Sequence, residues 1–71
     1  MKAYELYTKV SVKDGKDYCF ASLNLVDVED MDTITNETSK KSECWEYFSY
    51  EEEALHALDL FPYDELVNNV G

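Results

Sequence analysis

Residues 4–25, YELYTKVSVKDGKDYCFASLNL, decide the fold. From Tyr4 to Val12, apolar or β-branched side chains fill the even positions, and this period of two predicts a strand with one buried face. Asp14-Gly15 follows, a pair that readily adopts the positive φ angles of a tight hairpin turn. A turn at this point predicts a β-hairpin whose apolar face consists of the pairs Tyr4 with Leu25, Leu6 with Leu23, Thr8 with Ala21 and Val10 with Cys19.

The chain after the hairpin is less regular. Residues 27–43 are acidic and then mostly small and polar, which favours a loop, although a short strand at residues 33–35 remains open because long structureless loops are uncommon. Residues 44–48, CWEYF, predict a return strand. The sequence therefore offers three strands and leaves a fourth undecided.

A helix is predicted from residues 49–52, SYEE, because a serine followed three residues later by glutamate has the form of a capping box. Ala54, Leu55, Leu58 and Phe61 recur at helical spacing, and we expect Leu55, Leu58 and Phe61 to pack on the hairpin. Pro62 predicts the end of this helix and opens a second short helix carrying Leu66, Val67 and Val70.

These elements predict one α+β domain over residues 1–71. We expect a three- or four-stranded antiparallel sheet, with the N-terminal β-hairpin first, packed by one C-terminal helix plus a short terminal helix. A domain of this length buries only about 60–65% of the surface that its unfolded chain exposes. A deep catalytic cleft is therefore not expected.

The charge is strongly asymmetric. The chain has 16 acidic and 6 basic residues, a net charge of -10, and all six basic residues are lysines. Residues 1–26 carry four lysines against three acids, a net of +1, whereas residues 27–71 carry thirteen acids against two lysines, a net of -11. An acidic chain without arginine lacks the groups that bind phosphate and read guanine, so direct nucleic-acid binding is not expected.

The cellular setting is predicted from what the sequence lacks. No apolar run has the roughly 18 residues of a membrane span, and the N-terminus does not have the form of a signal peptide, so we expect a cytoplasmic protein without membrane attachment. The two cysteines, Cys19 and Cys44, are interpreted as reduced thiols, with a disulfide as the alternative.

Catalytic and metal-binding patterns are weak. Cys19 or Cys44 with His56, the single histidine, has no accompanying oxyanion loop or orienting group, so no enzyme activity and no cofactor are expected. The acids between residues 27 and 32 lack the glycine and the terminal glutamate of an EF-hand loop, so a solvated acidic loop is preferred over a calcium site.

Acidity as a recognition surface is the favoured interpretation. The predicted partner-binding residues are Asp27, Glu29, Asp30, Asp32, Glu51, Glu52 and Glu53. Their carboxylates would imitate a phosphate backbone and steer the protein to a basic groove. Ten aromatic residues supply further anchors for an interface.

In length, charge and compactness the chain resembles the small acidic inhibitors that bacteriophages and mobile elements encode, among them anti-CRISPR proteins and DNA mimics. That resemblance implies a monomeric or dimeric inhibitor that occludes a basic, nucleic-acid-binding surface of a partner protein, in the host cytoplasm if it is phage-encoded. The alternative is a small structural subunit that pairs with itself, with acidity serving only solubility. A small enzyme or a thiol switch that uses Cys19 or Cys44 is a third possibility.

Overall fold

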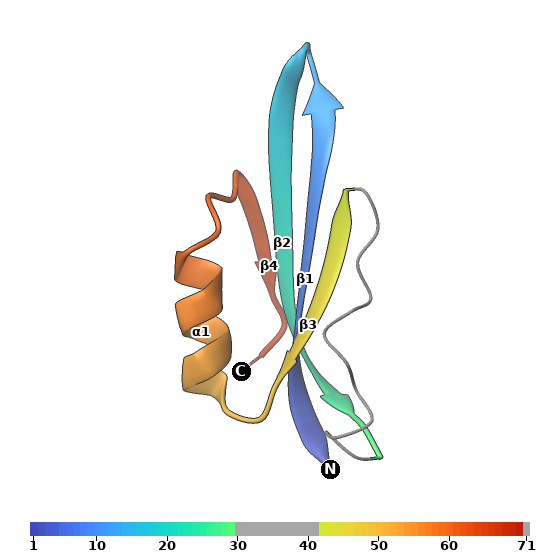
Figure 1. Ribbon diagram of the computed structural model, residues 1–71, viewed down its shortest axis with the longest axis vertical. Helices are drawn as coiled ribbons and strands as arrows, with labels where there is room; N and C mark the ends of the chain where they lie inside the picture. Colours follow the sequence, from blue (N-terminus) through green and yellow to red (C-terminus); the bar gives the residue numbers. More distant parts are fainter. Residues whose placement is uncertain (30–41, 71) are drawn as a thin grey trace.

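The computed structural model of the protein describes residues 1–29 and 42–70. Within these residues the chain forms four strands and one helix. In chain order they are β1 (Lys2–Lys13), β2 (Lys16–Asp27), β3 (Glu43–Phe48), α1 (Glu51–Asp59) and β4 (Glu65–Asn68). The strands form one sheet in the order β3-β1-β2-β4 (Figure 1).

The N-terminal hairpin is confirmed. β1 and β2 pair antiparallel in the predicted register, with Tyr4 opposite Leu25 and Val10 opposite Cys19. The turn residues Asp14 and Gly15 have φ angles of 54° and 77°, the left-handed values that a two-residue hairpin loop requires. The alternation of side chains and the turn chemistry agree, and together they fix the register.

The return strand is confirmed as β3, which pairs antiparallel with the outer side of β1. This pairing sets Tyr7 opposite Trp45 and Tyr4 opposite Phe48. Beside β3, the carbonyl of Ser42 also accepts the amide of Val10 of β1 at 2.9 Å. The possible strand at residues 33–35 lies outside the described residues.

The second short helix is wrong, because residues 65–68 form β4 instead. β4 pairs parallel with β2, so the sheet is mixed rather than antiparallel. Backbone hydrogen bonds hold both ends of β4 in place: the amide of Asp64 donates to the carbonyl of Cys19 at 2.8 Å, and that of Asn69 to Leu23 at 2.9 Å. Hydrogen bonds to the open edge of β2 stabilise residues 65–68 more than a short isolated helix would, because the first turn of a helix is costly to nucleate.

Helix α1 crosses from β3 at one edge of the sheet to β4 at the other. Its N-cap is Tyr50, which forms no side-chain cap, so the capping box predicted at Ser49 is wrong by one residue. The helix ends at Asp59, before Pro62 as predicted. The amides of Leu60 and Phe61 bond to carbonyls of its last turn.

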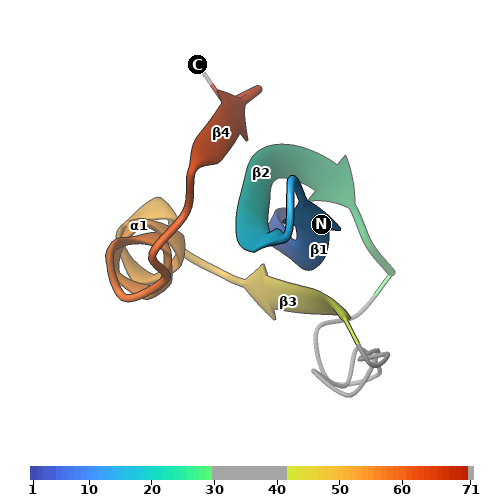
Figure 2. The same cartoon turned by 90° about the horizontal axis from the view of Figure 1, so that it is seen from above.

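The core lies between α1 and one face of the sheet (Figure 2). Its buried members are Leu6, Ala21, Leu23, Ala54 and Leu58, with Tyr4, Phe48, Ala57, Phe61, Leu66 and Val70 packed against them. Leu58 and Phe61 therefore pack as predicted, whereas Leu55 is 38% exposed and lies outside this cluster. Buried alanines let the helix approach the strands closely.

The hairpin projects beyond its neighbours at the end that carries the turn (Figure 1). The molecule measures 41 × 25 × 17 Å, and its radius of gyration is 12.5 Å. A compact domain of the same length would have a radius of gyration of about 11 Å. The projecting ends of β1 and β2 account for the excess, and they leave Val12 75% exposed.

Candidate functional site

Three of the predicted partner-binding residues form the first turn of α1. Glu51, Glu52 and Glu53 are all exposed to solvent. Their place at the helix start is favourable on its own, because carboxylates there interact with the positive end of the helix dipole. Helical geometry then keeps three negative charges within one turn, which we call the acidic turn.

An apolar hollow lies beside the acidic turn. It has a volume of about 410 Å³, is open to solvent, and is lined by Phe48, Glu52, Glu53, His56, Ala57 and Leu60. Leu60 is 74% exposed, so a large apolar side chain lies uncovered beside two carboxylates. This combination was not predicted, because the angle between β3 and α1 determines it.

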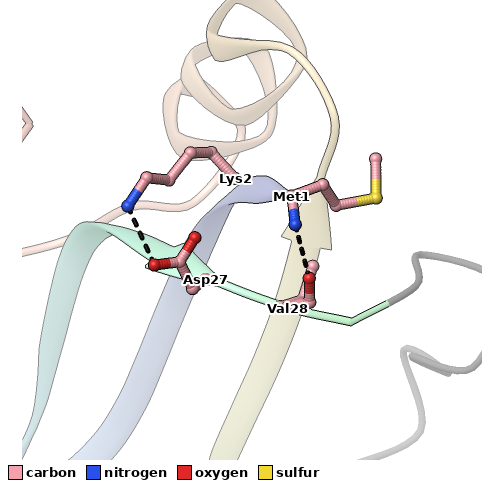
Figure 3. Close-up of polar contacts among 4 residues, drawn as sticks. All are labelled: Met1, Lys2, Asp27 and Val28. Carbon is pink, nitrogen blue, oxygen red and sulfur yellow. Dashed lines mark hydrogen bonds and ion pairs between the residues drawn. The ribbon is translucent and has the colours of Figure 1, made fainter.

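The other predicted acids do not join the acidic turn. Asp27 ends β2 and forms an ion pair with Lys2, with 3.0 Å between Nζ and Oδ2 (Figure 3). The N-terminal ammonium bonds to the Val28 carbonyl at 2.7 Å beside it, and Glu29 is exposed. In both overall views this end of β2 lies on the opposite side of the molecule from α1 (Figures 1 and 2). Asp30 and Asp32 lie outside the described residues.

A second surface occupies the face of the sheet turned away from α1. The ring centroids of Tyr7 and Trp45 are 5.1 Å apart with an interplanar angle of 43°, and those of Tyr7 and Phe20 are 6.2 Å apart, edge to face. Because β1 lies between β2 and β3, Tyr7 contacts both other rings. We call Tyr7, Phe20 and Trp45 the aromatic face.

Three tyrosine hydroxyls on this face donate hydrogen bonds to glutamates. The hydroxyl of Tyr7 donates to Glu43 Oε2 at 3.1 Å, that of Tyr47 to Glu5 Oε2 at 2.9 Å, and that of Tyr18 to Glu65 Oε1. Each bond joins residues on two neighbouring strands or strand ends, so it also ties the sheet together. The register of the hairpin sets Tyr7 and Phe20 on one side of it. The pairing of β3 with β1 adds Trp45 and Glu43, and that of β4 with β2 adds Glu65.

Burial and these contacts together raise the pKa of each of the three tyrosines above its ordinary value of 10.0. For Tyr7 and Tyr47, partial burial is the largest cause, followed by the hydrogen bond to the glutamate and its negative charge. For Tyr18 the bond to Glu65 comes first. A phenol beside a carboxylate holds its proton because ionisation would place two negative charges together.

The groups considered for catalysis lie on different elements. Cys44 is on β3, and its Sγ lies 3.9 Å from Glu46 Oε1; burial, and then this carboxylate, raise its pKa. His56 is exposed on α1 at the hollow. Among residues 1–29 and 42–70, no group of three or more His, Cys, Asp or Glu side chains is placed to hold a metal ion.

Comparison with protein-family models, curated proteins and solved structures gave no match to this chain. In the part of the chain that the structure describes, no helix is long and apolar enough to cross a membrane.

Proposed function

We propose that this protein is an acidic binding module that inhibits a partner protein by occluding its basic, nucleic-acid-binding surface. The observation that carries the proposal is the acidic turn beside the hollow: two of its three exposed carboxylates, Glu52 and Glu53, line the hollow together with the exposed Leu60 and the half-buried Phe48. Charge and apolar contact are thus available at one place.

The two parts of this site act at different distances. A net charge of -10 attracts a cationic groove from beyond contact range and accelerates encounter. At contact, Glu52 and Glu53 accept hydrogen bonds from lysine or arginine, while the partner fills the hollow with the apolar stem of such a side chain. Apolar packing adds the short-range specificity that charge alone lacks.

The absence of internal neutralisation supports this assignment. Within the described residues the single ion pair is Lys2–Asp27, so the carboxylates of the acidic turn have no cationic partner there. Asp27 and Glu29 contribute to the overall field on another side of the molecule. Asp30 and Asp32 remain predictions.

We place the activity in the cytoplasm, and in the host cytoplasm if the gene is carried by a bacteriophage. Cys19 and Cys44 are both free thiols in the structure, which is the ordinary state in a reducing compartment. The protein would act stoichiometrically, without catalysis or a cofactor, because blocking a groove requires only occupancy.

The test is capture of partners on the immobilised protein from a lysate of the source cell or its host, with elution by rising salt and displacement by added DNA or RNA. The proposal expects one nucleic-acid-binding protein, released by moderate salt and displaced by nucleic acid. The double variant Glu52→Gln/Glu53→Gln should lose that partner.

Asp14→Asn/Asp17→Asn is the matched control, because it removes the same charge at the turn of the hairpin, far from α1 (Figure 1). Equal loss of the partner in both variants would show that the acidic turn acts only through the net charge of the protein. Retention of the partner in both would overturn the assignment.

Self-association is the second candidate, and the outer edges of β3 and β4 favour it. Neither edge pairs with another described strand, and an open edge can pair with a second chain. Sedimentation over a range of concentrations separates the candidates: a concentration-dependent dimer whose mass is insensitive to Glu52→Gln/Glu53→Gln supports the structural role.

A further inference from the structure

The aromatic face has no part in the function proposed above. The register of the sheet places it on the side opposite Leu6, Ala21 and Leu23, and therefore opposite α1. Two rows of side chains cross it: Trp45, Tyr7, Ser22 and Val67 form one, and Glu43, Lys9, Phe20 and Glu65 form the other. The first row begins with two neighbouring rings, and the second places the Phe20 ring among charged side chains.

We propose that the aromatic face binds arginine side chains of an extended, cationic segment of a partner protein. A guanidinium group is planar and weakly hydrated, so it stacks on aromatic rings while its edges donate hydrogen bonds to carboxylates. The tilted Tyr7–Trp45 pair supplies ring surface, and Glu43 lies in the adjoining row.

Glu43 is positioned to receive such a donor. Tyr7 donates its hydroxyl proton to Oε2 of Glu43, which fixes the carboxylate beside the rings. A carboxylate accepts several hydrogen bonds, and Oε1 accepts none from the described residues. The tyrosine thus orients the acid without exhausting its capacity.

The charge close to the rings fits a cation. Glu5, Glu43 and Glu65 lie around the rings, with Lys9 in the same row as Glu43. The other two lysines of this face, Lys13 and Lys16, lie opposite each other at the hairpin turn, away from Tyr7 and Trp45. At the hairpin end of this face, the ammonium of Lys13 already lies 4.8 Å from the Tyr18 ring centroid. A tyrosine with a bonded glutamate therefore holds a cation within this structure, and Tyr7 with Glu43 repeats that arrangement beside Trp45.

The same charges disfavour the other common occupant of an aromatic sheet face. Stacked nucleobases bring phosphates within reach of the flanking side chains, and three glutamates would repel them. The aromatic face is thus assigned to a cationic chain rather than to a single-stranded nucleic acid.

Trp45 is the only tryptophan, so its fluorescence reports on this face alone. We would titrate the protein with tri-arginine at low salt and follow Trp45 emission, with tri-citrulline as the uncharged probe of the same length and oligothymidine as the nucleic-acid probe. Saturable change with tri-arginine, and none with the other two, is the expected result.

Matched variants locate the binding. Glu43→Gln should weaken tri-arginine binding about 2- to 5-fold, and Tyr7→Leu by a similar factor. Asp59→Asn, with the same change in net charge, should leave affinity unchanged because Asp59 is exposed at the end of α1, away from the aromatic face. Lys9→Gln should strengthen binding about 2-fold by removing a competing cation. Circular dichroism establishes that each variant is folded, and Glu43→Gln keeps the test valid if Tyr7→Leu does not fold.

Three results would overturn the proposal: equal weakening by Glu43→Gln and Asp59→Asn, saturable binding of oligothymidine, or an emission change that depends on protein concentration alone, which would assign the face to a second copy. None of them bears on the acidic turn. Conversely, failure of Glu52→Gln/Glu53→Gln to release a captured partner would leave the tri-arginine result intact.

Discussion

Tyr7 shows how one residue acquires its properties from several strands. Its pKa is raised first by burial and then by the hydrogen bond and charge of Glu43 on β3. Because the folded pKa lies above the unfolded value of 10.0, its contribution to stability is fully present below pH 10.0 and is lost as pH rises through the folded pKa. Ionised Tyr7 can no longer donate to Glu43.

We expect Glu43→Gln to lower the pKa of Tyr7 without returning it to the ordinary value, because burial persists. An NMR titration of the Tyr7 ring resonances measures this change. Glu46→Gln on the same strand is the matched control, since Glu46 does not contact Tyr7 through any bond that the structure records. Coincident curves for Glu43→Gln and the parent protein would contradict the role given to Glu43.

Cys44 is expected to be a slow nucleophile. Burial raises its pKa, and the charge of Glu46 and its hydrogen bond add to the rise, so little thiolate forms at neutral pH. Glu46→Gln should accelerate alkylation of Cys44 by iodoacetamide, as measured by peptide mass spectrometry, with Cys19 as the internal reference. Fast alkylation in the parent protein would instead favour a thiol switch.

Helix α1 begins without a side-chain cap. Tyr50 occupies the N-cap position in an extended conformation, and Glu53 lies three residues later, at N3. Since Tyr50 is 70% exposed, its ring contributes little to the core. A serine at this position would complete a capping box with Glu53.

Tyr50→Ser should therefore raise the free energy of unfolding by about 1 kcal/mol, measured by urea denaturation. Tyr50→Ala removes the same ring and cannot cap, so it is the control and should give no gain. Equal stability of the two variants would show that a serine hydroxyl satisfies the free amides of the helix start no better than solvent does.

Some elements form because of their own sequence, and others form only through contacts with distant parts of the chain. The hairpin was predicted to the residue because alternation and Asp14-Gly15 lie within the segment they shape. β4 was not, because Glu65, Leu66, Val67 and Asn68 are too few to carry a period. They become a strand through bonding to β2 and the packing of Leu66 on the core.

At the scale of the whole molecule, like charge opposes compactness. With a net charge of -10 in a body of 41 × 25 × 17 Å, carboxylates on opposite sides repel at low ionic strength. Screening acts over about 30 Å at 0.01 M salt and about 8 Å at 0.15 M, so added salt removes repulsion across the molecule.

The midpoint of thermal unfolding, measured by circular dichroism, should therefore rise between about 0.01 M and about 0.15 M sodium chloride. Over roughly this range the screening length falls below the dimensions of the molecule. The same series at the isoelectric point of about 4.2, where net charge vanishes, is the control and should be nearly flat. A midpoint that falls with salt at neutral pH would show that local ion pairs outweigh the general repulsion.

The sequence by itself determined the hairpin and its register, the return strand, the helix and its approximate end, and the exposed acids of its first turn. Each follows from neighbours within a few residues, through side-chain alternation, turn chemistry or helical spacing. Only the tertiary structure decided that β4 is a strand parallel to β2, that Asp27 and Glu29 lie apart from the acidic turn, and that Trp45 joins Tyr7 and Phe20. These depend on which edge of the hairpin each later segment pairs with, a choice made by long-range hydrogen bonding and burial that no local pattern records.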